Sequence, residues 1–241
     1  MSCRVAILDS GIHKGHPHLQ GMEIQGFSVE GEQAPFSIAD DYSDRTGHGT
    51  ACAAAMFRLN PEIELLAIRV LDDELTTTHL NLAYAIQCAA DRGAKIINLS
   101  LGTTEASSAE AICQAVDYAT SKSAICVAAA HPQGKRLWPA ELPSVLSASC
   151  HRSCPLGDMY RIQGPVPRFL CHGYPRPIEG RPPTDNLYGP SIAAAHLSAR
   201  AAEILATEPL DFDQLIRALE RRCRAQINAP TGTLDQRLRQ S

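Results

Sequence analysis

The sequence has 241 residues, of which 44% are hydrophobic, and this is enough for one domain with a single large core. Its formal net charge of -4 does not favour binding to nucleic acid or to an anionic membrane. No apolar run approaches the roughly 20 residues that span a bilayer, and the N-terminal apolar stretch is too short for a signal peptide. We therefore expect a single cytoplasmic domain over residues 1–241, without a pro-segment.

Buried strands and helices alternate along the predicted chain. Short apolar runs bounded by turn residues predict strands, and longer runs with helical periodicity predict the helices between them. The predicted strands cover 4–8, 64–71, 95–101, 124–130 and 145–150, and the predicted helices cover 47–59, 78–92, 109–121, 191–206 and 212–224. This alternation predicts a three-layer α/β fold, in which a mostly parallel sheet is covered by helices on both faces.

Residues 151–187 interrupt this pattern. They contain seven prolines and little helical periodicity, so we expect long loops with short extended pieces. The end of the chain, from about residue 228 to 241, is predicted to be a loose tail.

Nine cysteines are scattered through the sequence. An odd number in apolar segments favours buried free thiols over a disulfide framework. One group could supply four soft ligands to zinc, and it consists of Cys150, His151, Cys154, Cys171 and His172. Because the paired Cys-x2-Cys spacing of zinc sites is missing, we expect free thiols there and keep zinc as the alternative.

Three separated segments carry the residue types of a nucleophilic hydrolase. Asp9 ends the first predicted strand, His48 stands in Thr-Gly-His-Gly-Thr, and Ser191 stands in Gly-Pro-Ser-Ile-Ala at the start of a helix. A serine hydroxyl needs an adjacent base, an imidazole can serve as that base, and a carboxylate can fix its tautomer. Taken singly, these residues also fit a turn acid and two helix-start residues. Their combination favours catalysis.

These segments, in this order, resemble the subtilisin family of serine proteases. Residues 95–102, 124–130, 138–145 and 169–173 resemble further family segments, so the resemblance covers about residues 4–206. It implies a catalytic triad of Asp9, His48 and Ser191, with an acyl-enzyme on the serine and no cofactor or catalytic metal. It also implies substrate-binding residues at the ends of two strands, namely Ser100, Leu101, Gly102, Ala129, Ala130 and His131.

The sequence departs from the family at the position of the asparagine that donates to the oxyanion. Pro132 stands there, and proline has neither a side-chain donor nor an N–H. In subtilisin the loss of this donor lowers the rate about 10²–10³-fold. His131 or Gln133 could replace it, or no group does. His131 also takes the place of a glycine that would line the pocket for the residue before the scissile bond.

A second departure concerns calcium. Only residues 58–63 connect the helix after His48 to the next strand, where many relatives carry a calcium-binding loop. No cluster of oxygen ligands remains, so we expect no calcium at this position.

Two classes of function follow. The first is an active endopeptidase that pairs residues 100–102 and 128–130 with an extended peptide or protein substrate by strand addition. Small proteases of this kind resemble those that process peptide precursors, which suggests a partner protein in a peptide-processing pathway. The second is a pseudoprotease, a peptide-binding or assembly partner that retains the protease fold but is catalytically impaired. The same acyl-enzyme could also serve an esterase or a peptide ligase.

Overall fold

The computed structural model describes residues 2–228, so the predicted tail, beyond residue 228, lies outside the described residues. The strands are β1 (Cys3–Asp9), β2 (Ile24–Glu30), β3 (Ser37–Ala39), β4 (Ile63–Arg69), β5 (Ile96–Leu99), β6 (Ile125–Ala129), β7 (Leu146–Cys150), β8 (Met159–Ile162), β9 (Arg168–Cys171) and β10 (Ala225–Ile227). The helices are α1 (His48–Leu59), α2 (His79–Asp91), α3 (Ala106–Ser121), α4 (Pro190–Thr207) and α5 (Phe212–Arg221), with short 3-10 turns η1 (Pro17–Leu19) and η2 (Pro183–Asp185). Within residues 2–228, no helix combines the length and the hydropathy needed to cross a bilayer.

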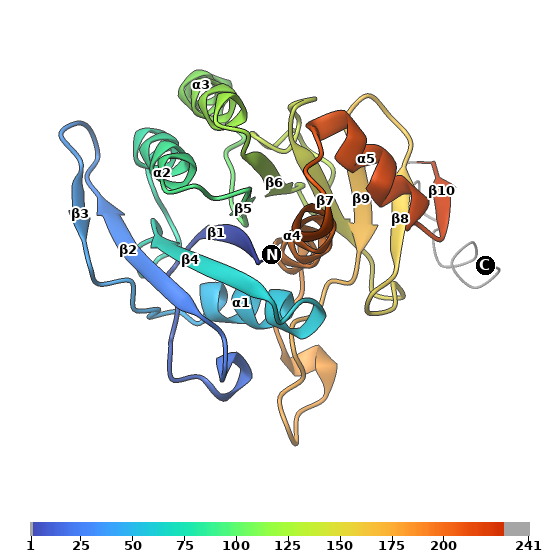
Figure 1. Cartoon of the computed structure of the whole chain (residues 1–241). Helices are drawn as coiled ribbons and strands as arrows, with labels where there is room; N and C mark the ends of the chain where they lie inside the picture. The colour runs from blue at the N-terminus through green and yellow to red at the C-terminus, as the bar shows by residue number, and fades with distance from the viewer. Residues whose placement is uncertain (1, 229–241) are drawn as a thin grey trace.

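All ten strands form one sheet in the order β10-β8-β9-β7-β6-β5-β1-β4-β2-β3 (Figure 1). The antiparallel pairs are β2–β3 and β8–β9, and the other neighbours are parallel. The central strands β5 and β6 are buried along their whole length, as expected of parallel strands covered on both faces. The mostly parallel sheet that the sequence predicted is therefore confirmed.

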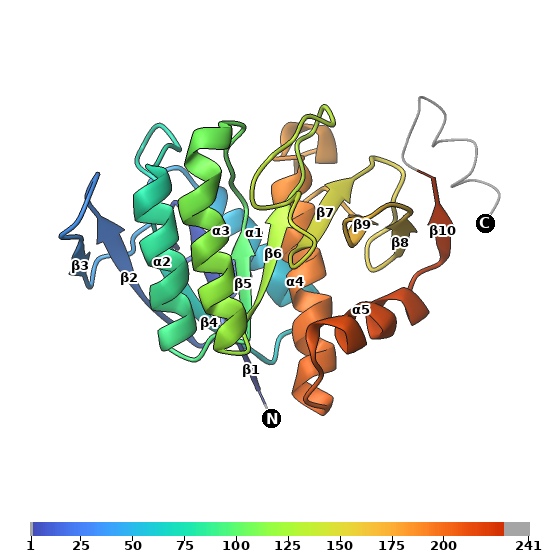
Figure 2. The same ribbon diagram turned by 90° about the horizontal axis from the view of Figure 1, so that it is seen from above.

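Helices cover both faces of this sheet and complete the three layers. The helices α2 and α3 pack on one face, whereas α1 and α4 pack on the other (Figures 1 and 2). Alternate residues of β1 divide between the two cores, with Val5 and Ile7 facing α1 and α4, and Ala6 and Leu8 facing α2 and α3. The fold class predicted from the alternating pattern is thus confirmed.

Three strands, β2, β3 and β10, have no counterpart among the predicted elements. Most lie at the margins of the sheet, where partly exposed residues blur the apolar signal. In β2, Gly26 interrupts the run of apolar side chains. This position requires glycine, because a Cβ there would lie 2.4 Å from the carbonyl oxygen of Ala67. The three residues of β3 are all exposed. The strands β8 and β9 are the short extended pieces within residues 151–187.

All nine cysteines are free, as the sequence predicted. The residues considered for zinc are engaged elsewhere. The thiol of Cys154 lies 3.6 Å from the carbonyl oxygen of Asp158, and Nδ1 of His172 donates to the Cys154 carbonyl at 2.7 Å. Among the residues described, this cysteine and histidine group does not place three ligand atoms within 4.8 Å of one another. The structure therefore offers no preformed zinc site at these residues.

His196 in α4 gives the fold an acid-sensitive element. It is 3% exposed, its Nδ1 donates to the carbonyl of His172 at 2.9 Å, and its Nε2 has no partner among the described residues. Burial lowers the pKa of His196 to about 4, although the bond to His172 opposes this shift. The unfolded chain therefore takes up the proton first, near pH 6.5.

We expect the free energy of unfolding to decrease as the pH falls from about 6.5 towards 4, with His196 responsible for up to about 3 kcal/mol. Replacing it with glutamine should flatten this pH dependence, because the variant has no imidazole to protonate. Urea denaturation at pH 7.5, 6 and 5 measures the effect, with His13→Gln as an exposed control. If the free energy of unfolding of His196→Gln depended on pH as steeply as that of the wild type, the acid sensitivity would belong to other groups.

Candidate active site

The site is built on Asp9, which ends β1 at the carboxyl edge of the parallel sheet. Its carboxylate is 1% exposed, and Oδ1 accepts hydrogen bonds from Nδ1 of His48 at 2.7 Å and from the N–H of Ser10 at 2.7 Å. His48 is the first residue of α1. The predicted contact between the carboxylate and the imidazole is therefore present, and it leaves Nε2 of His48 as the ring nitrogen available to act as a base.

Two glycines allow His48 to approach the strand end this closely. Gly47 caps α1 with φ of 85°, a left-handed conformation that suits glycine. A Cβ on Gly49 would lie 2.2 Å from the carbonyl oxygen of Gly11 and 3.2 Å from the Asp9 carboxylate. The Gly-His-Gly motif is thus a steric requirement of the junction between β1 and α1.

Asp44 organises the loop that leads into His48, a role the sequence pattern did not reveal. Its Oδ1 accepts from the hydroxyl of Ser10 at 2.9 Å and from the N–H of Gly47 at 2.9 Å. Its Oδ2 accepts from the N–H of Thr50 at 2.9 Å. Burial tends to raise the pKa of Asp44, but these hydrogen bonds outweigh it and lower the pKa, so the group is a carboxylate at neutral pH.

The charges around His48 adjust its basicity. Burial by itself lowers the pKa of His48, but the hydrogen bond and charge of Asp9, together with the charge of Asp44, raise the pKa above its ordinary value. An imidazolium at His48 would therefore be stabilised by two carboxylates.

Ser191 stands in the first turn of α4 and exchanges hydrogen bonds with Ser100. Its hydroxyl donates to the carbonyl oxygen of Ser100 at 3.0 Å, and the Ser100 hydroxyl donates to the carbonyl oxygen of Ser191 at 3.3 Å. Among the described contacts, the Ser191 hydroxyl is bonded to this carbonyl and not to His48. Proton transfer from this hydroxyl to the imidazole would first require a rotation of the Ser191 side chain.

Cys52 lies between the two halves of the site. Its Sγ is 3.5 Å from the hydroxyl of Ser100 and 3.9 Å from the carbonyl oxygen of Ser191. Ligand atoms of Asp9, His48 and Cys52 also lie within 4.8 Å of one another. This thiol, which is fully buried, therefore connects the Asp9–His48 pair with the Ser191 segment. Burial raises its pKa, so it is a neutral thiol.

The comparisons with known proteins agree with this geometry. The subtilase family description matches residues 2–222. The chain belongs to the subtilase family. It is 38% identical over 142 residues to thermitase from Thermoactinomyces vulgaris, an alignment that covers 54% of this chain and 48% of thermitase. The chain spans about half or less of the length of this and the next two curated relatives.

Solved structures with the same fold include sphericase and the prenylagaramide maturation protease PagA. Sphericase superposes with a TM-score of 0.70 at 24% identity, over 96% of this chain and 90% of its own. PagA superposes with a TM-score of 0.70 at 23% identity, over 94% of this chain and 90% of its own. At these identities the likeness establishes the fold.

A buried polar network holds Ser100 of this subtilase in position. The amide of Asn98, on β5, donates to the hydroxyl of Ser100 at 2.8 Å, and the hydroxyl of Ser198, on α4, donates to Oδ1 of Asn98 at 3.0 Å. Asn98 and Ser198 are fully buried. Because buried polar groups are costly unless satisfied, this chain of hydrogen bonds fixes α4 against β5 and so fixes Ser191. Sequence reasoning did not single out Asn98 or Ser198 as site residues.

The six predicted substrate-binding residues follow two neighbouring parallel strands. Ser100, Leu101 and Gly102 come directly after β5, and Ala129 ends β6 before Ala130 and His131. Since β5 also neighbours β1, these residues lie at the same edge of the sheet as Asp9. A Cβ on Gly102 would lie 2.4 Å from the carbonyl oxygen of Trp138, so this position requires glycine.

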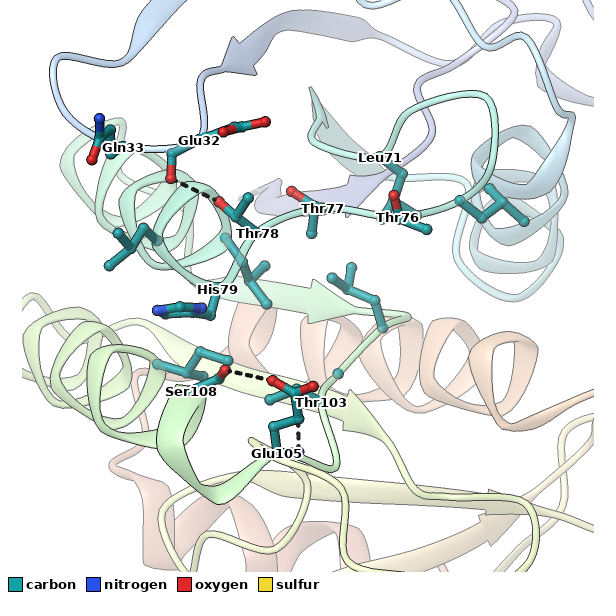
Figure 3. Close-up of a pocket in the computed structure, with 16 residues that line it drawn as sticks. Glu32, Gln33, Leu71, Thr76, Thr77, Thr78, His79, Thr103, Glu105 and Ser108 are labelled. Carbon is teal, nitrogen blue, oxygen red and sulfur yellow. Dashed lines mark hydrogen bonds between the residues drawn. The ribbon is translucent and has the colours of Figure 1, made fainter.

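A cavity of 680 Å³ adjoins this edge on the face of the sheet covered by α2 and α3. Leu101, Gly102 and Thr103 line it on one side, and the threonine-rich segment that leads into α2 lines it on the other (Figure 3). Leu75 and Leu80 are exposed at this cavity. It offers room for side chains of a peptide that runs along residues 100–102.

His131 and Gln133 form a tight turn after β6. The N–H of Gln133 donates to Nδ1 of His131 at 3.0 Å, and the N–H of Gly134 donates to the His131 carbonyl at 3.0 Å. Because Nδ1 accepts a hydrogen bond, a neutral His131 carries its proton on Nε2. The imidazole thus retains one donor, whereas Gln133 is exposed.

Proposed function

We propose that this chain is a serine endopeptidase in which Asp9, His48 and Ser191 form the catalytic triad. The observation that carries the proposal is the 2.7 Å hydrogen bond between the buried Asp9 carboxylate and His48, beside a serine at the start of a helix. After rotation away from Ser100, the Ser191 hydroxyl would give its proton to Nε2 of His48 and attack the scissile carbonyl. His48 would then donate that proton to the leaving amine.

The oxyanion would be stabilised by two donors of this chain. The N–H of Ser191 belongs to the first turn of α4, where helical N–H groups have no acceptor within the helix, and the helix dipole adds to the effect. The Nε2–H of His131 would supply the side-chain donor that Pro132 cannot. We favour His131 over Gln133 because the hydrogen bond from the Gln133 N–H to Nδ1 of His131 already orients the imidazole ring.

This assignment predicts different effects for two neighbouring variants. His131→Ala should lower kcat about 10²–10³-fold with little change in KM, because it removes a donor that acts mainly in the transition state. Gln133→Ala should leave kcat within about twofold of the wild type. Steady-state kinetics on one peptide substrate measures both, and a larger loss in Gln133→Ala would reverse the assignment.

The substrate that we propose is a precursor peptide processed in the cytoplasm, with a partner protein of the same pathway presenting it. All nine cysteines are free thiols, which suits a reducing compartment. One structural neighbour is the prenylagaramide maturation protease PagA, and this supports a processing role by analogy of fold. An extended peptide would pair with residues 100–102 and 128–130.

A fluorophosphonate probe followed by intact-mass measurement tests the enzymatic function. We expect one adduct on the wild-type chain and none on Ser191→Ala, because the probe reacts only with an activated serine. The alternative is a pseudoprotease that binds peptides without cleaving them, and the bond from Ser191 to the Ser100 carbonyl together with Pro132 favours it. A folded wild-type protein that never reacts with the probe would support that alternative.

A further inference from the structure

A second cavity, of 360 Å³, lies beside the first turns of α1 and is lined by three histidines. His13, His16 and His18 come from the loop after β1, and Arg176, Ile178 and Leu187 come from the segment before α4. We call this the histidine cavity. The two segments project from the sheet on its α1 side (Figure 1), and they touch where Nη1 of Arg176 donates to the carbonyl oxygen of His18 at 3.1 Å.

The histidine cavity adjoins the proposed catalytic residues on the face of the sheet opposite to the cavity beside Leu101 and Gly102. Its wall includes Thr46 and Gly47, which immediately precede His48, and Leu187, which stands four residues before Ser191. Ala51 and Ala54 of α1 also line it, whereas α2 and α3 line the other cavity. A peptide whose acyl side follows residues 100–102 would therefore direct its leaving side towards the histidine cavity.

The arginines at the histidine cavity have no ion-pair partner among the described residues. Arg176 and the nearby Arg58 form no ion pair within residues 2–228. Asp44 is the one acid among the described lining residues, and hydrogen bonds from Ser10, Gly47 and Thr50 already occupy both its oxygens. Burial, then the charges of Arg176, His16 and Arg58, lower the pKa of His18. Of these causes, the charges of Arg176, His16 and Arg58 disfavour a further cation near His18 and favour an anion there.

One of the three histidines, His16, presents a ring N–H as a hydrogen-bond donor. The rings of His16 and His18 lie 4.9 Å apart edge to face, and Nδ1 of His16 accepts from the N–H of His18 at 3.2 Å. A neutral His16 therefore carries its proton on Nε2 as a donor. At the rim, Ile178 is 41% exposed and Leu187 is 45% exposed. Exposed apolar side chains beside uncompensated cations suit an acidic residue that has an apolar neighbour.

We propose that the histidine cavity binds the carboxylate of an aspartate or glutamate on the leaving side of the peptide substrate, through Arg176 and the histidines. The inference rests on the proposed function, because it needs a peptide that passes Ser191. It identifies Arg176 as a specificity-determining residue whose loss should change substrate choice while leaving the catalytic step intact. Substrates with an acidic residue shortly after the cleaved bond would be preferred.

Cleavage of a peptide library of mixed sequence tests this proposal. Peptides are incubated with the wild type, with Arg176→Gln and with Arg217→Gln, which removes the same charge from an exposed position on α5. We expect Asp and Glu to be enriched about fivefold or more at one leaving-side position with the wild type and with Arg217→Gln. The enrichment should disappear with Arg176→Gln. Cleavage with no acidic enrichment, or with the same enrichment in Arg176→Gln, would overturn the inference and leave the proposed function standing.

A binding measurement separates the failure of this inference from the failure of the proposed function. If no variant cleaves the library, the proposed function fails. Whether or not the library is cleaved, peptides from it that are retained on immobilised Ser191→Ala protein are identified by mass spectrometry. Acidic peptides should be enriched on this protein and lost when Arg176→Gln is added. Retention without acidic enrichment would overturn the inference independently of catalysis.

Discussion

Replacing Ser191 with alanine is expected to abolish peptide hydrolysis, with a fall in kcat of about 10⁶-fold, the size found for the equivalent loss in subtilisin. The physical reason is that no other side chain of the site can form the acyl-enzyme. Cys52 also lies in the site, but it is fully buried, and its raised pKa keeps it a neutral thiol. Release of a fluorogenic amine from a peptide substrate measures the loss.

The matched control is Ser107→Ala, because Ser107 is exposed on α3. Asp9→Asn should be about 10⁴-fold slower than the wild type. It should also move the acid limb of kcat/KM to lower pH, since the charge of Asp9 raises the pKa of His48. Residual hydrolysis above about 1% in purified Ser191→Ala protein would contradict the assignment of the nucleophile.

Replacing Asp44 with asparagine is expected to reduce both stability and activity. An amide presents a donor where the carboxylate accepts from Thr50 or Gly47, so at least one of these hydrogen bonds becomes a repulsive contact. We expect the free energy of unfolding to fall by about 2–4 kcal/mol. We also expect kcat/KM to fall about 10–100-fold, because the loop would no longer hold His48 in register with Asp9. Urea denaturation and steady-state kinetics at pH 8 measure the two effects.

Asp40→Asn is the control for Asp44→Asn, since Asp40 is exposed in the same loop region. The lowered pKa of Asp44 adds a pH signature. Its stabilising contribution is present above the unfolded pKa of about 4 and is lost as the pH falls through the lower folded value. Asp44→Asn should therefore lose less stability than the wild type between pH 5 and 3. Unchanged activity in this variant would show that His48 is positioned without Asp44.

Sequence patterns predicted the central elements well because those elements are buried on both faces. The strands β1, β5 and β6 consist mostly of buried apolar residues, and α1 and α4 are rich in alanine because they pack closely on the sheet. The marginal strands β2, β3 and β10 lacked such a signal. Their positions depend on hydrogen bonds to neighbouring strands, which periodicity does not encode.

The site shows the same division. Asp9, His48 and Ser191 stand in motifs whose residue types declare their chemistry, so the sequence alone identified the candidate triad and its family. The roles of Asp44, Cys52 and Asn98 required the tertiary structure, because each has a partner far away in the chain, namely Ser10, Ser191 and Ser198 respectively. The histidine cavity is a further case, since Arg176 meets His18 only when loops 158 positions apart fold together. Local sequence determined which groups are present, and long-range packing decided which of them meet and in what charge environment.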